Sequence, residues 1–163
     1  MIFITVGTHE QGMDRLFMEI DKLIDEEIIT DEVFAQIGYT NYKPKNFNYK
    51  EMIGYDEMDN LIKKSSIVIT HGGPGSIFHP LRYGKIPIVV PRNPQFDEHV
   101  DNHQILFAKR LEESEKIIAI YNIKDLKDCI NNYEYLCRSC NIEGEKKQEF
   151  IKKFESIVSK LFR

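Results

Sequence analysis

The sequence predicts a single α/β domain over residues 1–163, built on a doubly wound parallel sheet. Two observations support this fold class. Short runs of β-branched residues alternate along the chain with segments in which apolar residues recur every three or four positions. Strands and helices that alternate in this way form parallel sheets with helices on both faces. A chain of 163 residues is also the usual size of one domain and can bury a full core.

The first half of the chain is expected to begin with a strand at Ile2–Val6, a β-branched run that ends at a glycine. A helix is expected over Met13–Glu27, because its apolar residues follow helical spacing. Val33–Ile37 has the composition of a second buried strand, and Tyr49–Ile53 is expected to form a short third one. Asp56–Lys64 has helical periodicity again, so a helix should cross back over the sheet.

The strongest strand signal, Ile67–Thr70, leads into a glycine-rich segment and a helix that ends near Tyr83, where a glycine follows. Ile86–Val90 has the composition of another buried strand. Beyond it the expected elements are a helix at His99–Glu113, a strand at Lys116–Tyr121, and helices at Ile123–Tyr135 and Glu143–Phe162.

Composition and charge exclude several classes of protein. The net charge of −4 argues against a non-specific nucleic-acid-binding protein, which usually has a basic surface. No apolar run approaches the roughly 18 residues that a membrane-spanning helix needs. The start of the chain lacks the basic and apolar regions of a secretory signal. A cytoplasmic location is therefore expected.

Three cysteines, Cys129, Cys137 and Cys140, fit a reducing compartment, because an odd number does not complete a disulfide framework. Cys137 and Cys140 form a CxxC pair. A zinc site of this type needs a second pair, which the sequence lacks. Free thiols in a loop are therefore favoured over a redox or metal site.

All five histidines are expected near one edge of the sheet. His9 follows the first strand, His71 and His79 follow the strand at residues 67–70, and His99 and His103 follow the strand at residues 86–90. Open α/β sheets bind ligands at the edge where their strands end. The ligand is therefore expected among these loops, and a solvated polar rim is the alternative.

The segment from His71 to Ser76, which contains Gly72, Gly73 and Gly75, joins a buried strand to a helix. Glycines let the backbone approach a ligand closely. The free amides and the dipole at the start of a helix favour an anion. The segment lacks the lysine of a Walker loop and the spacing of a dinucleotide fingerprint. It is interpreted as a phosphate-binding loop, in preference to a tight turn that needs glycines for packing alone.

The sequence from residue 67 to residue 104 resembles the carboxy-terminal domain of glycosyltransferase family 28. The matching motifs are His71-Gly-Gly-Pro-Gly-Ser76, Gly84-Lys-Ile-Pro87, Val90-Pro91 and Asp101-Asn-His-Gln104. The start of the chain, Val6-Gly-Thr-His-Glu-Gln-Gly12, is similar to that of the family's small stand-alone members. These are the small subunit of the eukaryotic dolichol-linked N-acetylglucosamine transferase and the bacterial PssE- and EpsF-type subunits of capsule and exopolysaccharide synthesis. The resemblance covers residues 1–121.

The resemblance implies a Rossmann-like domain that is the donor-binding half of a GT-B glycosyltransferase. Such a half holds a UDP-sugar without a metal or another cofactor, because the helix after the glycine loop stabilises the leaving diphosphate. A separate membrane-anchored subunit would bind a lipid-linked sugar acceptor and recruit this chain to the inner face of the cell membrane. The expected reaction is an inverting transfer in bacterial capsule or exopolysaccharide synthesis.

The resemblance and the positions of the loops together assign the candidate site residues. The donor-binding residues are Gly7, Thr8, His71, Gly72, Gly73, Gly75, Ser76, His79, Asn102 and Gln104. His9 and Glu10 are the catalytic candidates, one of which could act as a base toward the acceptor hydroxyl. His79 departs from the family, whose members usually have at this position a glutamate that binds the ribose hydroxyls. A neutral imidazole accepts one hydrogen bond and a carboxylate several, so Glu98 or Asp101 are alternative ribose contacts.

Two other functions remain open at this level. The chain could be a non-catalytic subunit that binds a nucleotide-sugar and supports its partner. It could instead be a metal-dependent hydrolase, because His99 and His103 stand four residues apart in an expected helix and would share one face. The C-terminal segment 143–163 is expected to help dock the partner, with Leu161 and Phe162 beyond the core of the domain.

Overall fold

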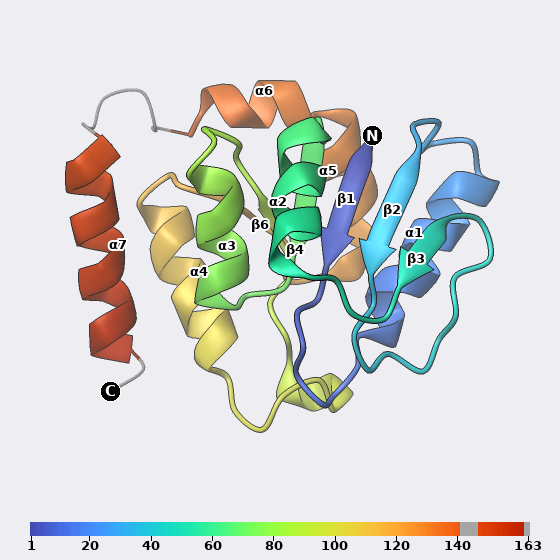
Figure 1. The fold of residues 1–163 in the computed structure, drawn as a ribbon, viewed down its shortest axis with the longest axis horizontal. Helices are drawn as coiled ribbons and strands as arrows, with labels where there is room; N and C mark the ends of the chain where they lie inside the picture. Colours follow the sequence, from blue (N-terminus) through green and yellow to red (C-terminus); the bar gives the residue numbers. More distant parts are fainter. Residues whose placement is uncertain (141–146, 162–163) are drawn as a thin grey trace.

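The computed structural model describes residues 1–140 and 147–161 (Figure 1). Its strands form one parallel sheet in the order β3-β2-β1-β4-β5-β6. The strands are β1 (Ile2–Thr5), β2 (Val33–Gln36), β3 (Asn48–Lys50), β4 (Ile67–Thr70), β5 (Ile88–Val89) and β6 (Ile118–Ala119). The chain adds β2 and β3 on one side of β1, and β5 and β6 on the far side of β4. The strand order therefore reverses between β1 and β4.

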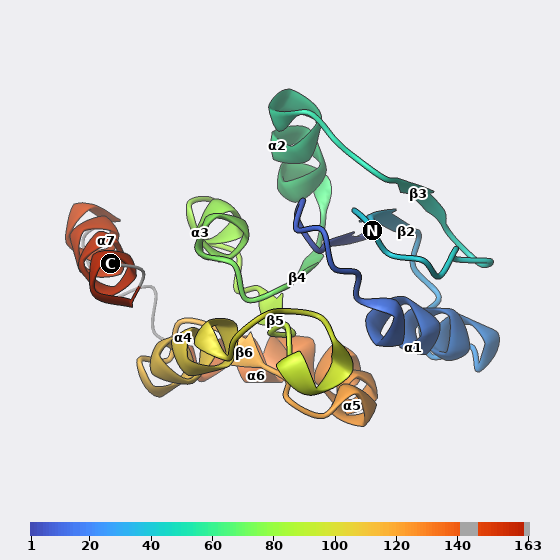
Figure 2. The ribbon, with the colours of Figure 1, turned by 90° about the horizontal axis from the view of Figure 1, so that it is seen from below.

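Helices cover both faces of the sheet. They are α1 (Asp14–Asp25), α2 (Tyr55–Lys64), α3 (Pro74–Leu81), α4 (His103–Glu113), α5 (Leu126–Asn131), α6 (Tyr133–Arg138) and α7 (Lys147–Leu161), with 3₁₀ turns at Pro94–Phe96 and Ile123–Asp125. Figure 2 shows α2 and α3 on one side of the sheet and α1, α5 and α6 on the other. None of the described helices is long and apolar enough to cross a membrane.

Alternate residues of the central strands belong to different cores. Ile4 and Ile69 pack in the large cluster under α1, whereas Phe3 and Val68 pack against Ile62 of α2. A third cluster joins α3, α4 and α7 to β5. Because both faces are covered, the central strands β1 and β4 are buried, largely apolar runs rather than alternating ones, as expected for a parallel sheet.

The predicted fold class is confirmed, and the differences lie at the ends of elements. β5 and β6 are shorter than the expected strands at residues 86–90 and 116–121, and β3 begins and ends earlier than expected. The helix predicted over Ile123–Tyr135 is divided, because the backbone of Asn132 leaves helical geometry between α5 and α6. The helix predicted over Glu143–Phe162 is found as α7, and the remainder of that prediction lies outside the described residues.

Helix α4 begins at His103, four residues later than predicted. The side chain of Asp101 accepts the amide hydrogen of His103 at 3.0 Å, which satisfies one of the free donors at the start of the helix. His99 therefore lies in the loop before α4 rather than on the helix.

Candidate functional site

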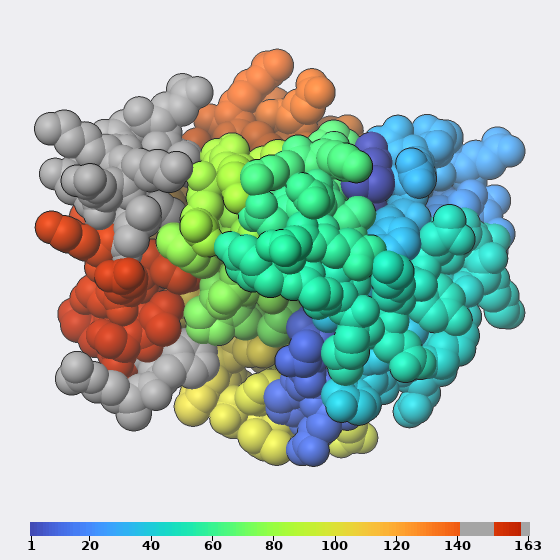
Figure 3. Space-filling model, viewed as in Figure 1, coloured from blue at the N-terminus to red at the C-terminus, as the bar shows by residue number. Residues whose placement is uncertain are grey.

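A pocket of about 310 Å³ lies at the point where the strand order reverses. Its walls come from the carboxyl ends of β1 and β2, from α2 and from the start of α3. Open α/β sheets bind their ligands at this position. Half of the predicted donor-binding residues line the pocket, namely Gly7, Thr8, Gly75, Ser76 and His79. In Figure 3 the loop after β1 (blue) lies at the lower edge of the molecule, between the teal chain before α2 and the yellow chain around α4.

The predicted residues Gly72, Gly73 and Gln104 meet in a buried network beside the pocket. Oε1 of Gln104 accepts the amide hydrogens of Gly72 at 3.0 Å and of Arg92 at 3.1 Å, which joins the loops after β4 and β5. The amide of Gly73 donates to Nδ1 of His71 at 3.1 Å. The side chain of Gln104 therefore holds two loops together, and its contact with a ligand stays a prediction.

The first turn of α3 offers free donors next to this network. Pro74 begins the helix and has no amide hydrogen. Among the residues that the structure describes, none accepts a hydrogen bond from the amide of Gly75 or of Ser76. A helix start with free amides attracts an anion. Within the predicted phosphate-binding loop, the amides of Gly75 and Ser76 are therefore the ones available to a ligand.

The imidazole of His71 fills the space between two glycines. A β-carbon at Gly7, where φ is +70°, would lie 2.7 Å from Nε2 of the ring, and one at Gly73 would lie 2.2 Å from Cε1. Both positions therefore need glycine, because the ring occupies the place of a side chain. The same nitrogen, Nε2, lies 3.0 Å from Oγ of Ser76.

We expect the fold to lose stability as the pH falls from 6.5 toward about 4.5, because folded His71 excludes a proton. Burial, aided by the charge of Arg92, lowers the pKa of His71 to about 3 from its ordinary value of 6.5. Between these values the unfolded chain binds a proton that the folded chain does not, so the free energy of unfolding decreases with decreasing pH. The pKa of Asp59 is also lowered, but from an ordinary value of 3.8, so its effect on the free energy of unfolding falls mainly below this pH interval.

Melting temperatures of the wild type and of His71→Gln, at about pH 7.5 and about pH 4.5, test this expectation. The variant should lose less stability between the two conditions. His9, whose pKa is also lowered, is common to both proteins and cancels in the comparison. The same acid-induced loss in both proteins would show that His71 is not the group responsible.

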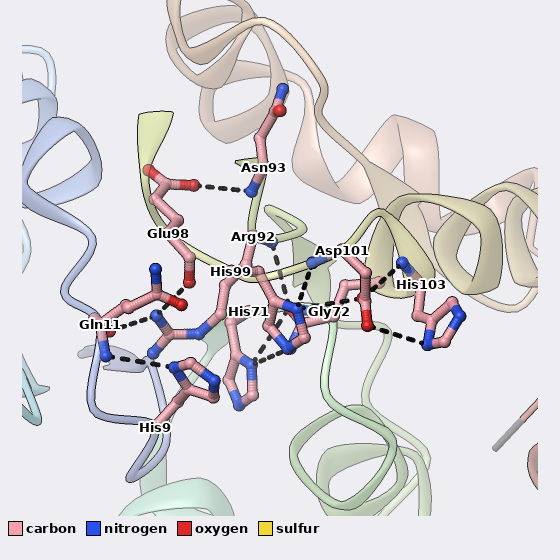
Figure 4. Close-up of polar contacts among 11 residues, drawn as sticks. His9, Gln11, His71, Gly72, Arg92, Asn93, Glu98, His99, Asp101 and His103 are labelled. Carbon is pink, nitrogen blue, oxygen red and sulfur yellow. Dashed lines mark hydrogen bonds and ion pairs between the residues drawn. The ribbon is translucent and has the colours of Figure 1, made fainter. Parts of the chain in front are cut away.

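Arg92, which no sequence motif indicated, joins the loops after β1 and β5 around the site (Figure 4). Its side chain is fully buried, and its guanidinium donates to the carbonyl oxygens of Val6, Gln11 and Glu98. These carbonyls belong to the loops after β1 and β5. Burial lowers the pKa of Arg92 to about 10, which leaves it charged at neutral pH. A single arginine directly after Pro91, at the end of a buried strand, is the signal that could have indicated this role.

The carboxylate of Glu98 is buried and accepts hydrogen bonds from within the protein. Its carboxylate accepts two hydrogen bonds from Arg15, at 2.6 and 3.0 Å, and a third from the amide of Asn93 at 3.0 Å. Asp101 accepts the amide hydrogen of His103. Neither carboxylate lines the pocket at the strand reversal. The alternative assignment of the ribose contact to these two residues is therefore not supported.

His79 is paired with an acidic residue of the neighbouring helix. Its Nε2 lies 2.8 Å from Oδ1 of Asp59 in α2, and its ring stacks on Tyr55 with the centroids 5.4 Å apart. Hydrogen bonds from His79, Lys63 and Tyr83 lower the pKa of Asp59. The imidazole of His79 is therefore paired with the carboxylate of Asp59, a contact that the sequence did not indicate.

His9 and Glu10 lie on the loop after β1 that Arg92 holds. Nδ1 of His9 accepts the amide hydrogen of Gln11 at 3.1 Å, and the ring stacks on His99 with centroids 4.7 Å apart. Burial and the charge of Arg92 lower the pKa of His9. The neutral ring then carries its hydrogen on Nε2, so neither nitrogen offers a free lone pair. Glu10 is exposed, and no hydrogen-bond or ion-pair partner lies on its carboxylate within the described part of the chain.

The histidine pair on which the metal-dependent hydrolase alternative depends is not formed. His99 precedes α4 and His103 begins it, so the prediction that they share one helix face is wrong. Both rings instead lie beside Asp101, at 3.1 and 3.3 Å. Over residues 1–140 and 147–161, no group of three or more His, Cys, Asp or Glu residues is placed to hold a metal ion. Asn102 is exposed and does not line the pocket, so its contact with a donor stays a prediction.

The three cysteines are free thiols that do not line the pocket. Burial raises the pKa of Cys137 and raises that of Cys140 to about 11. The thiolate, which is the reactive form, is therefore disfavoured at both positions of the CxxC pair.

Comparison with known proteins identifies relatives. The family model of the glycosyltransferase family 28 C-terminal domain matches residues 1–160. Among curated proteins, the UDP-N-acetylglucosamine transferase subunit ALG13 of Yarrowia lipolytica is 29% identical over 108 aligned residues, a match that covers 56% of this chain and 52% of that protein. The chain therefore spans about half the length of this relative.

Two solved glycosyltransferases share the fold. The glycosyltransferase of kitacinnamycin superposes with a TM-score of 0.59 at 15% identity, and the calicheamicin glycosyltransferase CalG4 with a TM-score of 0.57 at 12% identity. The matches cover 94% and 98% of this chain but 43% of each of the other two. The chain thus has the α/β, Rossmann-like fold of one part of a GT-B glycosyltransferase.

Proposed function

The chain belongs to the glycosyltransferase family 28 C-terminal domain family, and from this premise we propose that it is the donor-binding subunit of a two-component glycosyltransferase. Its donor is a UDP-sugar, and the transfer inverts the anomeric configuration without a metal. The observation that carries the proposal is the pocket at the strand reversal, where the amides of Gly75 and Ser76 are open to an anion. The name of the Yarrowia relative, a UDP-N-acetylglucosamine transferase subunit, supports the choice of donor.

In this proposal the diphosphate of the donor lies at the start of α3. The free amides and the helix dipole bind the negative charge that develops on the leaving group. This stabilisation takes the place of a metal ion, which performs the same task in other transferases. Gly7 and Gly73 make room for the buried ring of His71, and Gly72 is held by Gln104. In the proposal, His71, Gly73 and Gln104 support the loop and do not contact the donor themselves.

The nucleoside of the donor occupies the part of the pocket between α2 and α3. Ile53, Tyr55 and Met58 form an apolar wall there, and His79 also lines the pocket. Because Nε2 of His79 donates to Asp59, Nδ1 keeps a lone pair for a ribose hydroxyl. The carboxylate that orients the ring also makes it a better acceptor. Asp59 and His79 together thus take the role that the resemblance gives to one glutamate.

Replacing Asp59 by asparagine is expected to weaken UDP binding by a few-fold to about ten-fold, because the ring of His79 loses the anion that orients it. The affinity for inorganic pyrophosphate should stay unchanged, since that ligand has no ribose. Calorimetric titrations with both ligands measure the difference. Asp56→Asn, an exposed position in the first turn of the same helix, is the matched control. An equal loss of affinity for both ligands would contradict the ribose assignment.

The partner is proposed to contact the carboxyl edge of the sheet and the end of α7. Large apolar side chains are exposed at this edge, in its loops and turns and at the start of α2, namely Tyr39, Met52, Tyr55, Phe96 and Val100. Such side chains are consistent with a protein interface. Helix α7 itself is anchored on this domain through Phe154, which is 5% exposed and stacks on Phe78. The side chain of Leu161 and all of Phe162 lie outside the described residues, so their docking role stays a proposal.

The proposed partner is a membrane-anchored subunit that holds a lipid-linked sugar acceptor at the inner face of the cell membrane. The process is capsule or exopolysaccharide synthesis in a bacterium. A subunit that binds the donor without contributing a catalytic group is the second candidate. Glu10 is exposed on the loop after β1, and its carboxylate has no hydrogen-bond or ion-pair partner among the described residues, which favours the catalytic role over this alternative.

Transfer assays with a panel of radiolabelled UDP-sugars test the proposal. Sugar should enter the lipid fraction only when this chain and its acceptor-binding partner are both present, and an excess of EDTA should not reduce the rate. If the purified chain alone transfers sugar to a lipid acceptor at ordinary enzyme rates of about 1–10³ s⁻¹, the two-component proposal is wrong.

A further inference from the structure

Two hydrogen-bond donors converge on one ring nitrogen of His71. The amide of Gly73 donates to Nδ1 at 3.1 Å, and Nε2 of Gln104 lies 3.3 Å from the same nitrogen. The orientation of the Gln104 amide is fixed, because its oxygen already accepts the amide hydrogens of Gly72 and Arg92. Nδ1 of His71 is therefore an acceptor, and the hydrogen of the neutral ring is on Nε2.

The ring remains neutral at physiological pH. His71 is only 8% exposed. The buried guanidinium of Arg92 is close enough for its positive charge to oppose protonation of the ring. A neutral imidazole has one donor and one acceptor. In His71 the acceptor serves Gly73 and the donor points at Oγ of Ser76, 3.0 Å away. Both hydrogen-bonding groups of the ring are therefore used inside the protein.

The donor of His71 decides how Ser76 can interact with a ligand. A hydroxyl has one hydrogen and two lone pairs. Because Oγ accepts the hydrogen of Nε2, its own hydrogen is free to point into the pocket that Ser76 lines, beside the free amide of the same residue. In the opposite tautomer Nε2 would accept the hydroxyl hydrogen. Ser76 would then present lone pairs to the pocket and repel an anion.

We infer that His71 is a positioning residue that makes the hydroxyl of Ser76 a hydrogen-bond donor to a phosphate group of the ligand. The ring acts through Ser76 and is itself enclosed by Gly7, Gly73 and Gln104. The inference rests on the proposed function for the identity of the ligand, a nucleoside diphosphate. The assignment of the tautomer stands on the contacts of the ring alone.

Nitrogen-15 NMR of the full chain, labelled at histidine, tests the tautomer without any ligand. From about pH 8 to about pH 5 the His71 ring should show a protonated Nε2 and an unprotonated Nδ1. The spectrum of His71→Gln identifies the resonances that belong to this ring. A hydrogen on Nδ1, or titration of the ring near its ordinary value of 6.5, would overturn the inference.

Titration of UDP into two variants of similar size tests the action through Ser76. Glutamine places its amide nitrogen near the position of Nε2 and can donate to Ser76, whereas asparagine reaches only the position of Nδ1. His71→Asn should therefore weaken UDP binding by about ten-fold to a hundred-fold, as Ser76→Ala does, and His71→Gln by much less. Adding His71→Asn to Ser76→Ala should cause no further loss.

Equal affinities of the two His71 variants, or additive losses in the double variant, would overturn the inference. Circular dichroism shows whether each variant is folded. If neither His71 variant folds, the tautomer observed by NMR in the wild-type chain decides whether the inference holds. Failure of the wild-type chain to bind UDP counts against the proposed function instead. The two ideas can thus fail separately.

Discussion

A chain with Gly75→Val is expected to lose affinity for UDP by about a hundred-fold or more while it keeps its melting temperature. Apart from the two neighbouring residues and the backbone of α3 itself, no atom of the described residues lies within 4 Å of the place that a β-carbon at Gly75 would take, so the fold tolerates a side chain there. Valine is also a better helix former than glycine. Gly75 lines the pocket and has a free amide at the start of α3. The valine would therefore occupy the place proposed for the diphosphate.

Gly73→Val is the matched comparison, two residues earlier in the same loop. Its β-carbon would lie 2.2 Å from Cε1 of the buried His71 ring, so the protein itself must give way. Overpacking of this kind costs about 1–3 kcal/mol of folding free energy, which lowers the melting temperature by roughly 2–4 °C per kcal/mol in a chain of this size. Both variants should lose UDP binding, and Gly73→Val alone should lose stability. Normal UDP binding by Gly75→Val would place the diphosphate elsewhere.

Glu10→Gln is expected to lower the rate of sugar transfer by about 10²–10⁴-fold in the complex with the acceptor-binding partner, with the affinity for UDP unchanged. Glu10 is exposed on the loop that Arg92 holds, and its carboxylate has no partner among the described residues. A carboxamide cannot take the proton of the acceptor hydroxyl. The kinetic constant kcat and the UDP affinity, measured on the same preparation, separate loss of a base from loss of donor binding.

His9→Gln is the control for this experiment. The lone pair of the neutral His9 ring is already used by the amide of Gln11, so the ring is poorly placed to act as a base. We expect a smaller effect on kcat than for Glu10→Gln. A larger loss in His9→Gln would return the role of base to the histidine. Full turnover of Glu10→Gln would move the base to the partner.

The fold class and the glycine loop could be predicted from sequence, because both depend on local patterns. β4 has the predicted bounds, since its β-branched run ends at Thr70, shortly before Gly72 and Gly73. The start of α4 could not be predicted in this way. It depends on a hydrogen bond from the amide of His103 to the side chain of Asp101. Hydrophobic periodicity carries no information on such a contact. For this reason the alternative that placed His99 and His103 on one helix face was wrong.

The partners of the site residues could not be predicted, because they come from distant elements. Asp59 reaches His79 from another helix, and Gln104 ties the loop after β5 to the loop after β4. The sequence of a glycine-rich loop does not indicate which of its amides donate hydrogen bonds inside the fold. In this protein the amides of Gly72 and Gly73 donate to the side chains of Gln104 and His71. The sequence could therefore locate the edge of the sheet at which an anion is proposed to bind, but it could not assign the individual donors.

Titration of UDP into the purified chain, with EDTA in excess, shows whether this domain binds the nucleotide by itself. We expect saturable binding of one UDP per chain without Mg²⁺. Ser76→Ala should weaken the binding by roughly 1–3 kcal/mol, the value of a hydrogen bond to a charged phosphate oxygen. An absolute requirement for Mg²⁺, or an absence of binding to the folded chain, would contradict the claim that this domain holds a UDP-sugar through its own amides and hydroxyl.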